Sequence, residues 1–276
     1  MKKLLLVIAL FIAGRTIAFS QTGEVNFRQR MDTLKMLGKS ILSGRTDSMR
    51  SATNAKFLTL MQETLNNPES FKASFDSVSN VSLLISPDNL VRVYTWTLPK
   101  VDMSAYTYFG FVQHYDKKKK KVTAARLHDA SAMVENPQSQ KLKAESWYGA
   151  VYYDILESKR GGKKYYTLLG WKGNDRITTK KVLEVMYLKK DSVMFGYPHF
   201  KGEKGYTNRV VFEYASEAVM VLRYEPSKKM IVFDHLSETG NNTAGPDGKY
   251  DAYKLVKGRW EFVKDVDVSQ FPDRKK

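Results

Sequence analysis

The chain has 276 residues, of which 42% are hydrophobic, and it carries a formal net charge of +16 from 45 Lys and Arg against 29 Asp and Glu. This composition is typical of a folded globular protein and excludes an intrinsically disordered chain, which could not bury enough apolar surface to fold. Because the chain has no cysteine, disulfide bonds, thiolate metal sites and a lipid-modified cysteine anchor are excluded as well.

Residues 1–20 have the pattern of a secretory signal peptide. Two lysines follow the initiating methionine, an apolar run extends from Leu4 to Gly14, and Ala18-Phe19-Ser20 forms a small-x-small cleavage site. The apolar run is too short to span a bilayer core of about 30 Å, which needs about 20 apolar residues. We therefore expect cleavage before Gln21 and export to the periplasm or the outer membrane of a Gram-negative bacterium. No later apolar stretch reaches this length, so no transmembrane segment is expected after cleavage.

Residues 21–69 are expected to form a helical hairpin, because their apolar residues recur at helical spacing. The two apolar stripes comprise Val25, Met31, Leu34, Leu37 and Ile41 in the first helix, and Phe57, Leu58, Leu60, Met61 and Leu65 in the second. Asp47 or Ser48 is the predicted N-cap of the second helix. Pro68 is its predicted end, because proline cannot continue the helical hydrogen-bond ladder.

From residue 70 to residue 276 the apolar period changes to two, as in β-strands. Turn signals separate consecutive strands at Ser86–Asn89, at the lysine run Lys117–Lys121, at Gly161-Gly162 and at Lys257-Gly258. Serial hairpins with short connections favour antiparallel sheet over βαβ units. The predicted fold class is mainly β, or α+β: an antiparallel, hairpin-rich β domain over residues 70–276, built as a sandwich, a barrel or a small propeller, beside the N-terminal helical hairpin.

Three further details of this domain are predicted. Thr178–Val185 is expected to form a short helix with a threonine N-cap. Residues 210–233 are expected to form a three-stranded meander. In a strand over Trp147–Leu156, the side chains of Trp147 and Tyr152 would lie on opposite faces, because successive strand residues point in opposite directions.

Four segments of the second half of the chain carry a resemblance to other proteins. These are YYTLLGWKGND at Tyr165–Asp175, the following TTKKVLEVM, the later IVFDHLSETG, and GPDGKYDAY at Gly245–Tyr253. They resemble segments of exported, β-rich bacterial envelope proteins that have no assigned activity. The resemblance covers roughly the C-terminal half of the chain. It implies an envelope location and a β-rich domain, and it supplies no catalytic residue.

The positive charge is concentrated in the middle of the chain, where residues 117–190 hold 18 Lys or Arg and 7 Asp or Glu. A surface of this sign attracts polyanions through Coulomb steering and counterion release. In the periplasm these are lipid headgroups, lipopolysaccharide phosphates and acidic glycans, whereas nucleic acid is disfavoured by the compartment. The alternative is that the lysines only solubilise the protein and protect its hairpin ends from edge pairing. The candidate anion-binding residues are Lys117, Lys118, Lys119, Lys120, Lys121, Lys159, Arg160, Lys163 and Lys164.

The sequence offers no strong catalytic or cofactor motif. The histidines lack the spacing of a zinc site, and neither a nucleophile elbow nor a phosphate-binding glycine loop is present. No metal and no cofactor are therefore expected. A weak calcium alternative rests on Asp247 and Asp251, which match the end of some calcium loops, although Thr243 and Gly245 upstream supply no carboxylate.

These observations favour an exported, non-enzymatic binding or assembly component of the cell envelope, with a basic surface for anionic partners. The alternative function is a hydrolase that acts on an envelope polymer, with Asp154, Glu157 or Asp175 among its acids. Two carboxylates about 5–10 Å apart across one cleft would favour that enzyme. The sequence identifies neither catalytic residues nor a protein partner.

Overall fold

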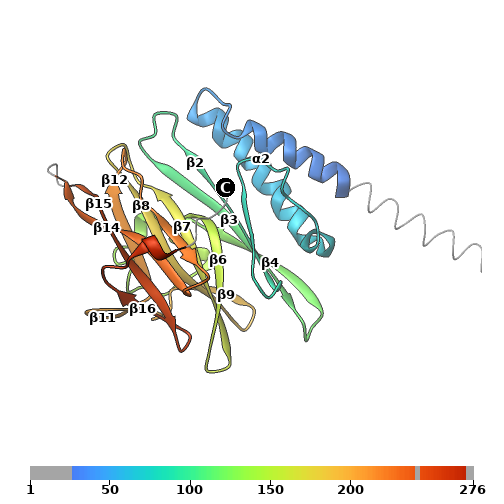
Figure 1. The fold of residues 1–276 in the computed structure, drawn as a ribbon. Coiled ribbons are helices and arrows are strands. Elements are labelled where there is room, and N and C mark those ends of the chain that lie inside the picture. Colours follow the sequence, from blue (N-terminus) through green and yellow to red (C-terminus); the bar gives the residue numbers. More distant parts are fainter. Residues whose placement is uncertain (1–26, 240–242, 272–276) are drawn as a thin grey trace, which may run out of the picture.

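The computed structural model describes residues 27–239 and 243–271 (Figure 1). Strands make up 49% of the structure and helices 19%, with two helices preceding antiparallel sheets, which confirms the predicted mainly β class. The predicted signal peptide, its cleavage site and Val25 lie outside the described residues. Within the described ranges, no helix combines the length and hydropathy needed to cross a bilayer.

Two helices form the outermost layer of the molecule (Figure 1). The first occupies residues 27–40, and the second, α2, spans Asp47–Asn66. Both predicted apolar stripes are used for packing, since Leu34, Phe57 and Met61 are fully buried in one core cluster. The helical hairpin is therefore held by the sheet beneath it.

The ends of α2 depend on two side chains. Its N-cap is Thr46, whose hydroxyl accepts a hydrogen bond from the Met49 N–H at 3.2 Å. The prediction of Asp47 or Ser48 is wrong by one or two residues, because Thr46 is the last residue with extended backbone. The helix ends just before Pro68, as predicted, and the 3₁₀ turn η1 (Pro68–Phe71) follows.

Sixteen strands form three sheets among the described residues. The first sheet has the order β1 (Ser82–Ile85), β2 (Val91–Pro99), β3 (Tyr106–Asp116) and β4 (Lys121–His128). The central sheet has the order β5 (Leu142–Lys143), β9 (Ser192–Phe195), β8 (Thr178–Lys189), β7 (Lys163–Gly173) and β6 (Val151–Arg160), and β12 (Arg209–Ala215) also pairs with β8. The third sheet has the order β11 (Gly205–Thr207), β10 (Phe200–Gly202), β16 (Arg259–Val263), β15 (Thr243–Val256), β14 (Met230–Thr239) and β13 (Leu222–Glu225).

Short 3₁₀ turns lie between strands at η2 (Ser131–Met133) and η3 (Ala144–Ser146), and η4 (Val268–Gln270) follows the last strand, β16. All strand pairs are antiparallel except β10 with β16, which are parallel. The described strands form no closed barrel, so the barrel among the predicted architectures is wrong. The three sheets are stacked open sheets instead.

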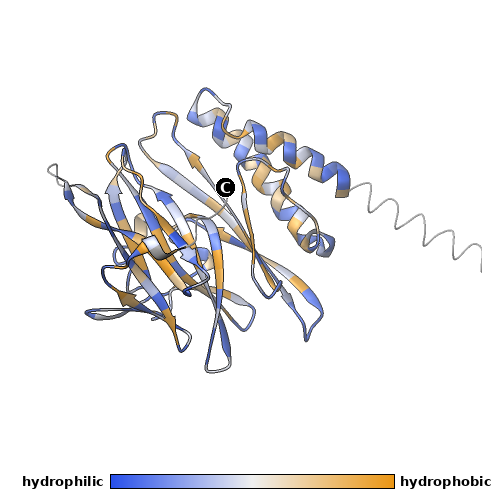
Figure 2. Cartoon of the chain, in the orientation of Figure 1, coloured by the Kyte–Doolittle hydropathy of each residue, from blue (hydrophilic) through white to orange (hydrophobic). Residues whose placement is uncertain are grey.

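The layers follow one another as helices, first sheet, central sheet and third sheet (Figure 1). In the first sheet, Trp96 packs toward the helices, whereas Val93 packs toward the central sheet. In the central sheet, Leu168 faces the first sheet and Leu169 faces the third. The central sheet is thus covered on both faces. Hydrophobic residues accordingly occupy the inner parts of its strands, and hydrophilic residues gather at many hairpin turns (Figure 2).

Residues 178–185 belong to strand β8 and do not form the predicted short helix. Both faces of β8 are covered, so Val182, Leu183, Val185 and Met186 are all fully buried. A strand buried on both faces loses the alternation of apolar and polar residues. Its pattern can therefore be mistaken for that of a buried helix.

The predicted meander over residues 210–233 is wrong for its first strand, whereas the pairing of its second and third strands is confirmed. Strand β12 pairs with β8 in the central sheet, with Arg209 opposite Glu184, whereas β13 pairs with β14 in the third sheet. The chain therefore changes sheets after β12. A charge pair between Arg209 and Glu184, described below, helps to keep β12 on β8.

Trp147 and Tyr152 lie together, contrary to the prediction that they occupy opposite faces. Strand β6 begins only at Val151, and Gly149 turns the chain before it with a φ of +70°. The Trp147 indole N–H donates to the Tyr152 hydroxyl at 2.8 Å, and the two ring centroids are 5.9 Å apart. The turn at Gly149 breaks the period of two on which the prediction depended.

Candidate functional site

Hairpin turns from all three sheets lie at one end of the molecule, several of them at the lower side of the view in Figure 1. Lys119, in the β3–β4 turn, pairs with Asp191, in the β8–β9 turn, at 2.8 Å. Gly258, in the β15–β16 turn, lies so close to the Lys159 carbonyl of β6 that a Cβ atom would collide with it. The Leu255 N–H donates to the Lys229 carbonyl at 3.0 Å, which places the β13–β14 turn at the same end.

We call this surface the basic end, because these turns and the strand residues next to them are rich in lysine. All nine candidate anion-binding residues from the sequence lie here, joined by the turn lysines of three further hairpins. Its basic residues are Lys117–Lys121, Lys159, Arg160, Lys163, Lys164, Lys189, Lys190, Lys228, Lys229 and Lys257. In contrast, Lys180 and Lys181 lie at the start of β8, away from this end.

Carboxylates neutralise only part of the basic end. Lys119 pairs with Asp191, Lys164 pairs with Asp88 of the β1–β2 turn, and Lys159 lies 3.7 Å from Glu157. The other basic residues of the β3–β4, β6–β7 and β8–β9 hairpins have no carboxylate of a described residue within ion-pair distance. They are Lys117, Lys118, Lys120, Lys121, Arg160, Lys163, Lys189 and Lys190. Eight basic side chains of this end therefore have no ion-pair partner among the described residues.

A cavity of about 360 Å³ lies between the β6–β7 and β8–β9 turns of the basic end. Its polar lining consists of Lys163, Lys164, Lys189 and Lys190 together with Tyr165, Tyr187 and Tyr197. The rings of Tyr165 and Tyr197 have centroids 4.5 Å apart. Burial, reinforced by Tyr197, raises the pKa of Tyr165 to about 12. The Tyr165 hydroxyl therefore stays protonated well above physiological pH.

Four lysines of the basic end occupy left-handed backbone positions. Their φ values are +50° at Lys120, +57° at Lys190, +53° at Lys229 and +47° at Lys257. Glycine and asparagine adopt this conformation at low cost, whereas other residues pay about 1 kcal/mol or more. The chain therefore places charge at positions where glycine would favour folding.

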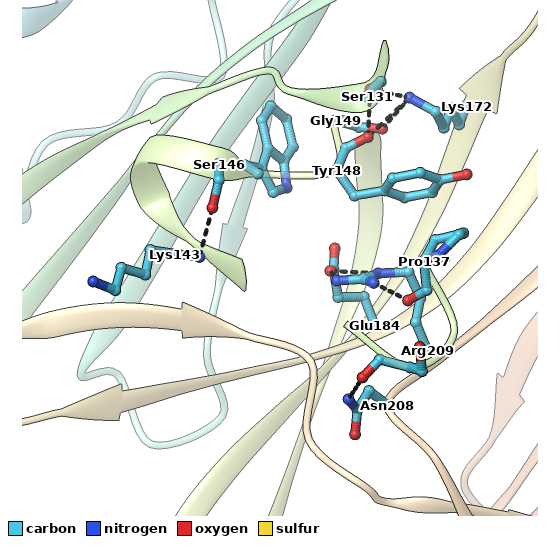
Figure 3. A network of polar contacts seen from close by, with 12 residues as sticks. Ser131, Pro137, Lys143, Ser146, Tyr148, Gly149, Lys172, Glu184, Asn208 and Arg209 are labelled. Atoms are coloured by element: carbon cyan, nitrogen blue, oxygen red, sulfur yellow. Dashed lines mark hydrogen bonds and ion pairs between the residues drawn. The ribbon is translucent and has the colours of Figure 1, made fainter. Parts of the chain in front are cut away.

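A buried polar cluster connects β8 with β12 (Figure 3). Glu184 and Arg209 are completely buried and form an ion pair, with the Arg209 Nε donating to Glu184 at 2.6 Å. The Arg209 guanidinium also donates to the Pro137 carbonyl, and the Tyr152 hydroxyl donates to Glu184. Each charged group is satisfied by protein partners, as a buried ion pair requires. The cluster holds the central sheet together.

Ser131 and Lys172 lie side by side, although sequence reasoning assigned neither of them a role. The Lys172 Nζ donates to the Ser131 hydroxyl at 2.6 Å and to the Tyr148 and Gly149 carbonyls at 2.9 and 3.0 Å (Figure 3). A serine and a neutral lysine can act together in acyl transfer. Here three oxygen acceptors surround the Lys172 amine, and this environment suits a protonated ammonium group. Its hydrogen bonds tie the segment around Ser131 to β7. We assign Lys172 a structural role.

The three acids of the hydrolase hypothesis are not brought together as a pair across a cleft. Asp154 accepts a hydrogen bond from the Ile155 N–H at 2.8 Å, and Asp175 accepts from the N–H groups of the turn that leads into β8. Glu157 lies at the basic end, 3.5 Å from Lys164. Asp154 and Asp175 thus bond to neighbouring backbone groups, whereas Glu157 of β6 lies beside a lysine of the adjacent strand β7.

The two residues of the calcium alternative lie on either side of His235. The Asp251 carboxylate is 2.8 Å from the His235 Nδ1 and also accepts from the Asp265 N–H. Asp247 is 3.9 Å from the His235 Nε2. Within the described part of the chain, no three His, Asp or Glu side chains are grouped so that they could hold a metal ion.

Glycine at a left-handed lysine position should stabilise the protein. We expect Lys190→Gly to raise the free energy of unfolding by about 0.5–1 kcal/mol, because it removes the strain at a φ of +57°. The neighbouring Lys189→Gly, within strand β8, is the matched control and should lower that free energy by about 0.5–1 kcal/mol. Urea unfolding of the two variants measures both effects. A loss of stability in both would show that the left-handed position carries no strain.

Lys172 should make stability depend on pH above neutrality. Burial lowers the pKa of Lys172 from 10.5 to about 8. Between these two pKa values the unfolded chain binds more protons than the folded protein, so stability rises with pH, by about 1–3 kcal/mol in total. Lys172→Met should lack this rise. Urea unfolding of both proteins across the interval measures it, and parallel pH profiles would contradict the assigned burial.

Comparison of the chain with protein-family models, with curated proteins and with solved structures found no match. The function proposed below therefore rests on the charge and geometry of the basic end.

Proposed function

We propose that this protein is an exported, non-enzymatic binding or assembly component of the bacterial cell envelope, and that its basic end contacts an anionic surface. One observation carries the proposal. Lysines from five hairpins, spread over residues 117–257, lie at one end of the molecule. The partners with suitable chemistry are anionic lipid headgroups, lipopolysaccharide phosphates and acidic glycans.

The physical basis is the sum of many weak charge interactions. Each lysine near an anionic membrane surface contributes about 1 kcal/mol, and the interaction is screened over about 8 Å at physiological ionic strength. Only charges at the tips of the turns can approach a flat surface this closely. Because the basic end collects unpaired lysines at such tips, it favours contact with an extended anionic surface through several turns at once.

Removal of four unpaired lysines should weaken this contact. We expect a variant with Lys117, Lys118, Lys120 and Lys121 replaced by glutamine to bind phosphatidylglycerol vesicles at least tenfold more weakly than the wild type, since each charge contributes about 1 kcal/mol. Lys119 is kept because it pairs with Asp191. Cosedimentation at low and high salt measures binding, and wild-type binding should fall steeply with salt because exposed charges are screened.

A matched variant controls for net charge. Lys100, Lys204, Lys249 and Lys264 are exposed, lie outside the basic end and form no ion pair with a described residue. Their replacement by glutamine removes the same charge and should leave binding near the wild-type value. Equal losses in both variants would show that net charge alone drives binding. Absence of binding at low salt would overturn the proposal.

The export part of the proposal has a separate test. Protein isolated from the envelope or the culture fluid of its native cells should begin at Gln21, because Ala18-Phe19-Ser20 forms the expected cleavage site. N-terminal sequencing identifies the first residue. Cytosolic protein that retains Met1 and residues 2–20 would contradict export.

A further inference from the structure

A second and larger cavity borders the basic end, between η1 and the first sheet. Its volume is about 770 Å³, within the range of about 300–1,000 Å³ that is usual for small-molecule sites. Apolar side chains from separate elements form much of its wall, namely Phe71 from η1, Ile85 from β1, Tyr115 from β3 and Val122 from β4. Ile85 is 44% exposed although it is a large aliphatic residue on a strand. The cavity thus offers apolar surface to a ligand.

The wall is held in place by contacts that do not involve a ligand. The Arg92 guanidinium donates to the Ala73 carbonyl at 2.6 Å and lies 5.4 Å from the centre of the Phe71 ring. The Phe71 and Tyr115 ring centroids are 6.1 Å apart. These contacts tie η1, and the segment after it, to strands β2 and β3. The cavity is therefore preformed, which lowers the cost of binding.

The mouth of the cavity is cationic. Lys72, Lys120 and Lys121 line it, all three are exposed, and none has an ion-pair partner among the described residues. Glu69 is the one acidic residue of the described lining. An anionic group would be attracted to this rim, whereas an apolar chain would bury the exposed surface of Ile85 and its neighbours.

We infer that this cavity binds the acyl chain of an anionic lipid, with the phosphate at Lys120, Lys121 and Lys72. A glycan polyanion would use the lysines but leave the apolar wall exposed to water. A neutral lipid would contact the apolar wall but would form no charge interaction with the lysines at the mouth. The inference rests on the proposed function and narrows its anionic partner from lipid or glycan to lipid.

The test uses three soluble probes to separate the contribution of the acyl chain to binding from that of the phosphate charge. Titration calorimetry of the purified protein is carried out with palmitoyl lysophosphatidic acid, with palmitoyl lysophosphatidylcholine and with glycerol 3-phosphate, all below micelle formation. We expect one lysophosphatidic acid per protein, with an affinity at least tenfold above that for lysophosphatidylcholine. Glycerol 3-phosphate, which lacks the chain, should not bind measurably.

Variants assign the binding to this cavity. Ile85→Gln should weaken lysophosphatidic acid binding at least fivefold, whereas Ile177→Gln, the same change at an exposed position just before β8, should not. Val122→Trp, which fills the cavity, should abolish binding. Replacement of Lys120 and Lys121 by glutamine should weaken binding of lysophosphatidic acid but leave that of lysophosphatidylcholine unchanged. Melting temperatures verify that each variant is folded.

Two results would overturn the inference. One is lysophosphatidic acid binding that Ile85→Gln and Val122→Trp leave unchanged, and the other is glycerol 3-phosphate binding as tightly as the lipid. Dextran sulfate, a polyanion without an acyl chain, distinguishes failure of the lipid-binding cavity from failure of the proposed function of the basic end. Wild-type protein that binds dextran sulfate in a salt-dependent manner but binds no lysolipid refutes the cavity while the basic end keeps its role. Failure to bind any of these probes contradicts both.

Discussion

The central sheet is buried on both faces, and the rest of the structure depends on this constraint. Strands β7 and β8 pack against the first sheet through Leu168 and Val182, and against the third sheet through Leu169 and Leu183. A charged side chain in the middle of such a strand must be fully paired, as Glu184 is by Arg209. All other charges of these strands are placed toward the strand ends, so the lysines collect at the turns or, like Lys172, satisfy carbonyl groups.

The stacking of the sheets then turns local lysine runs into one surface. Because the hairpins of the three sheets end at the same side of the molecule, turns that are far apart in the chain come within ion-pair distance, as Lys119 and Asp191 do. The same end borders the cavity beneath η1, whose rim includes Lys120 and Lys121. Positive charge and exposed apolar surface therefore meet at one place. The left-handed φ of Lys120 indicates that this charge is kept there against the preference of the backbone.

Much of the fold could be predicted because it depends on local signals. The turns at Ser86–Asn89, Gly161-Gly162 and Lys257-Gly258 mark real hairpins, and the lysine runs mark the candidate site. Strand β8 could not be recognised, since burial on both faces removes the alternation that identifies a strand. The partners of Glu184 and Ser131 could not be found either, because Arg209 and Lys172 lie 25 and 41 residues away in the chain. The cavity depends on Phe71, Ile85 and Val122, which approach one another only in the folded protein.

The central claim is that the basic end is the surface that meets an anionic partner. Since the chain contains no cysteine, a single introduced cysteine can carry an environment-sensitive dye at one chosen position. Lys118→Cys places the dye in the β3–β4 turn of the basic end. Lys264→Cys places it just after β16, at the end of this strand that lies away from the basic end. We expect anionic vesicles to shift the dye emission to shorter wavelength at position 118 and not at position 264. An equal shift at both positions, or a shift at position 264 alone, would contradict the account.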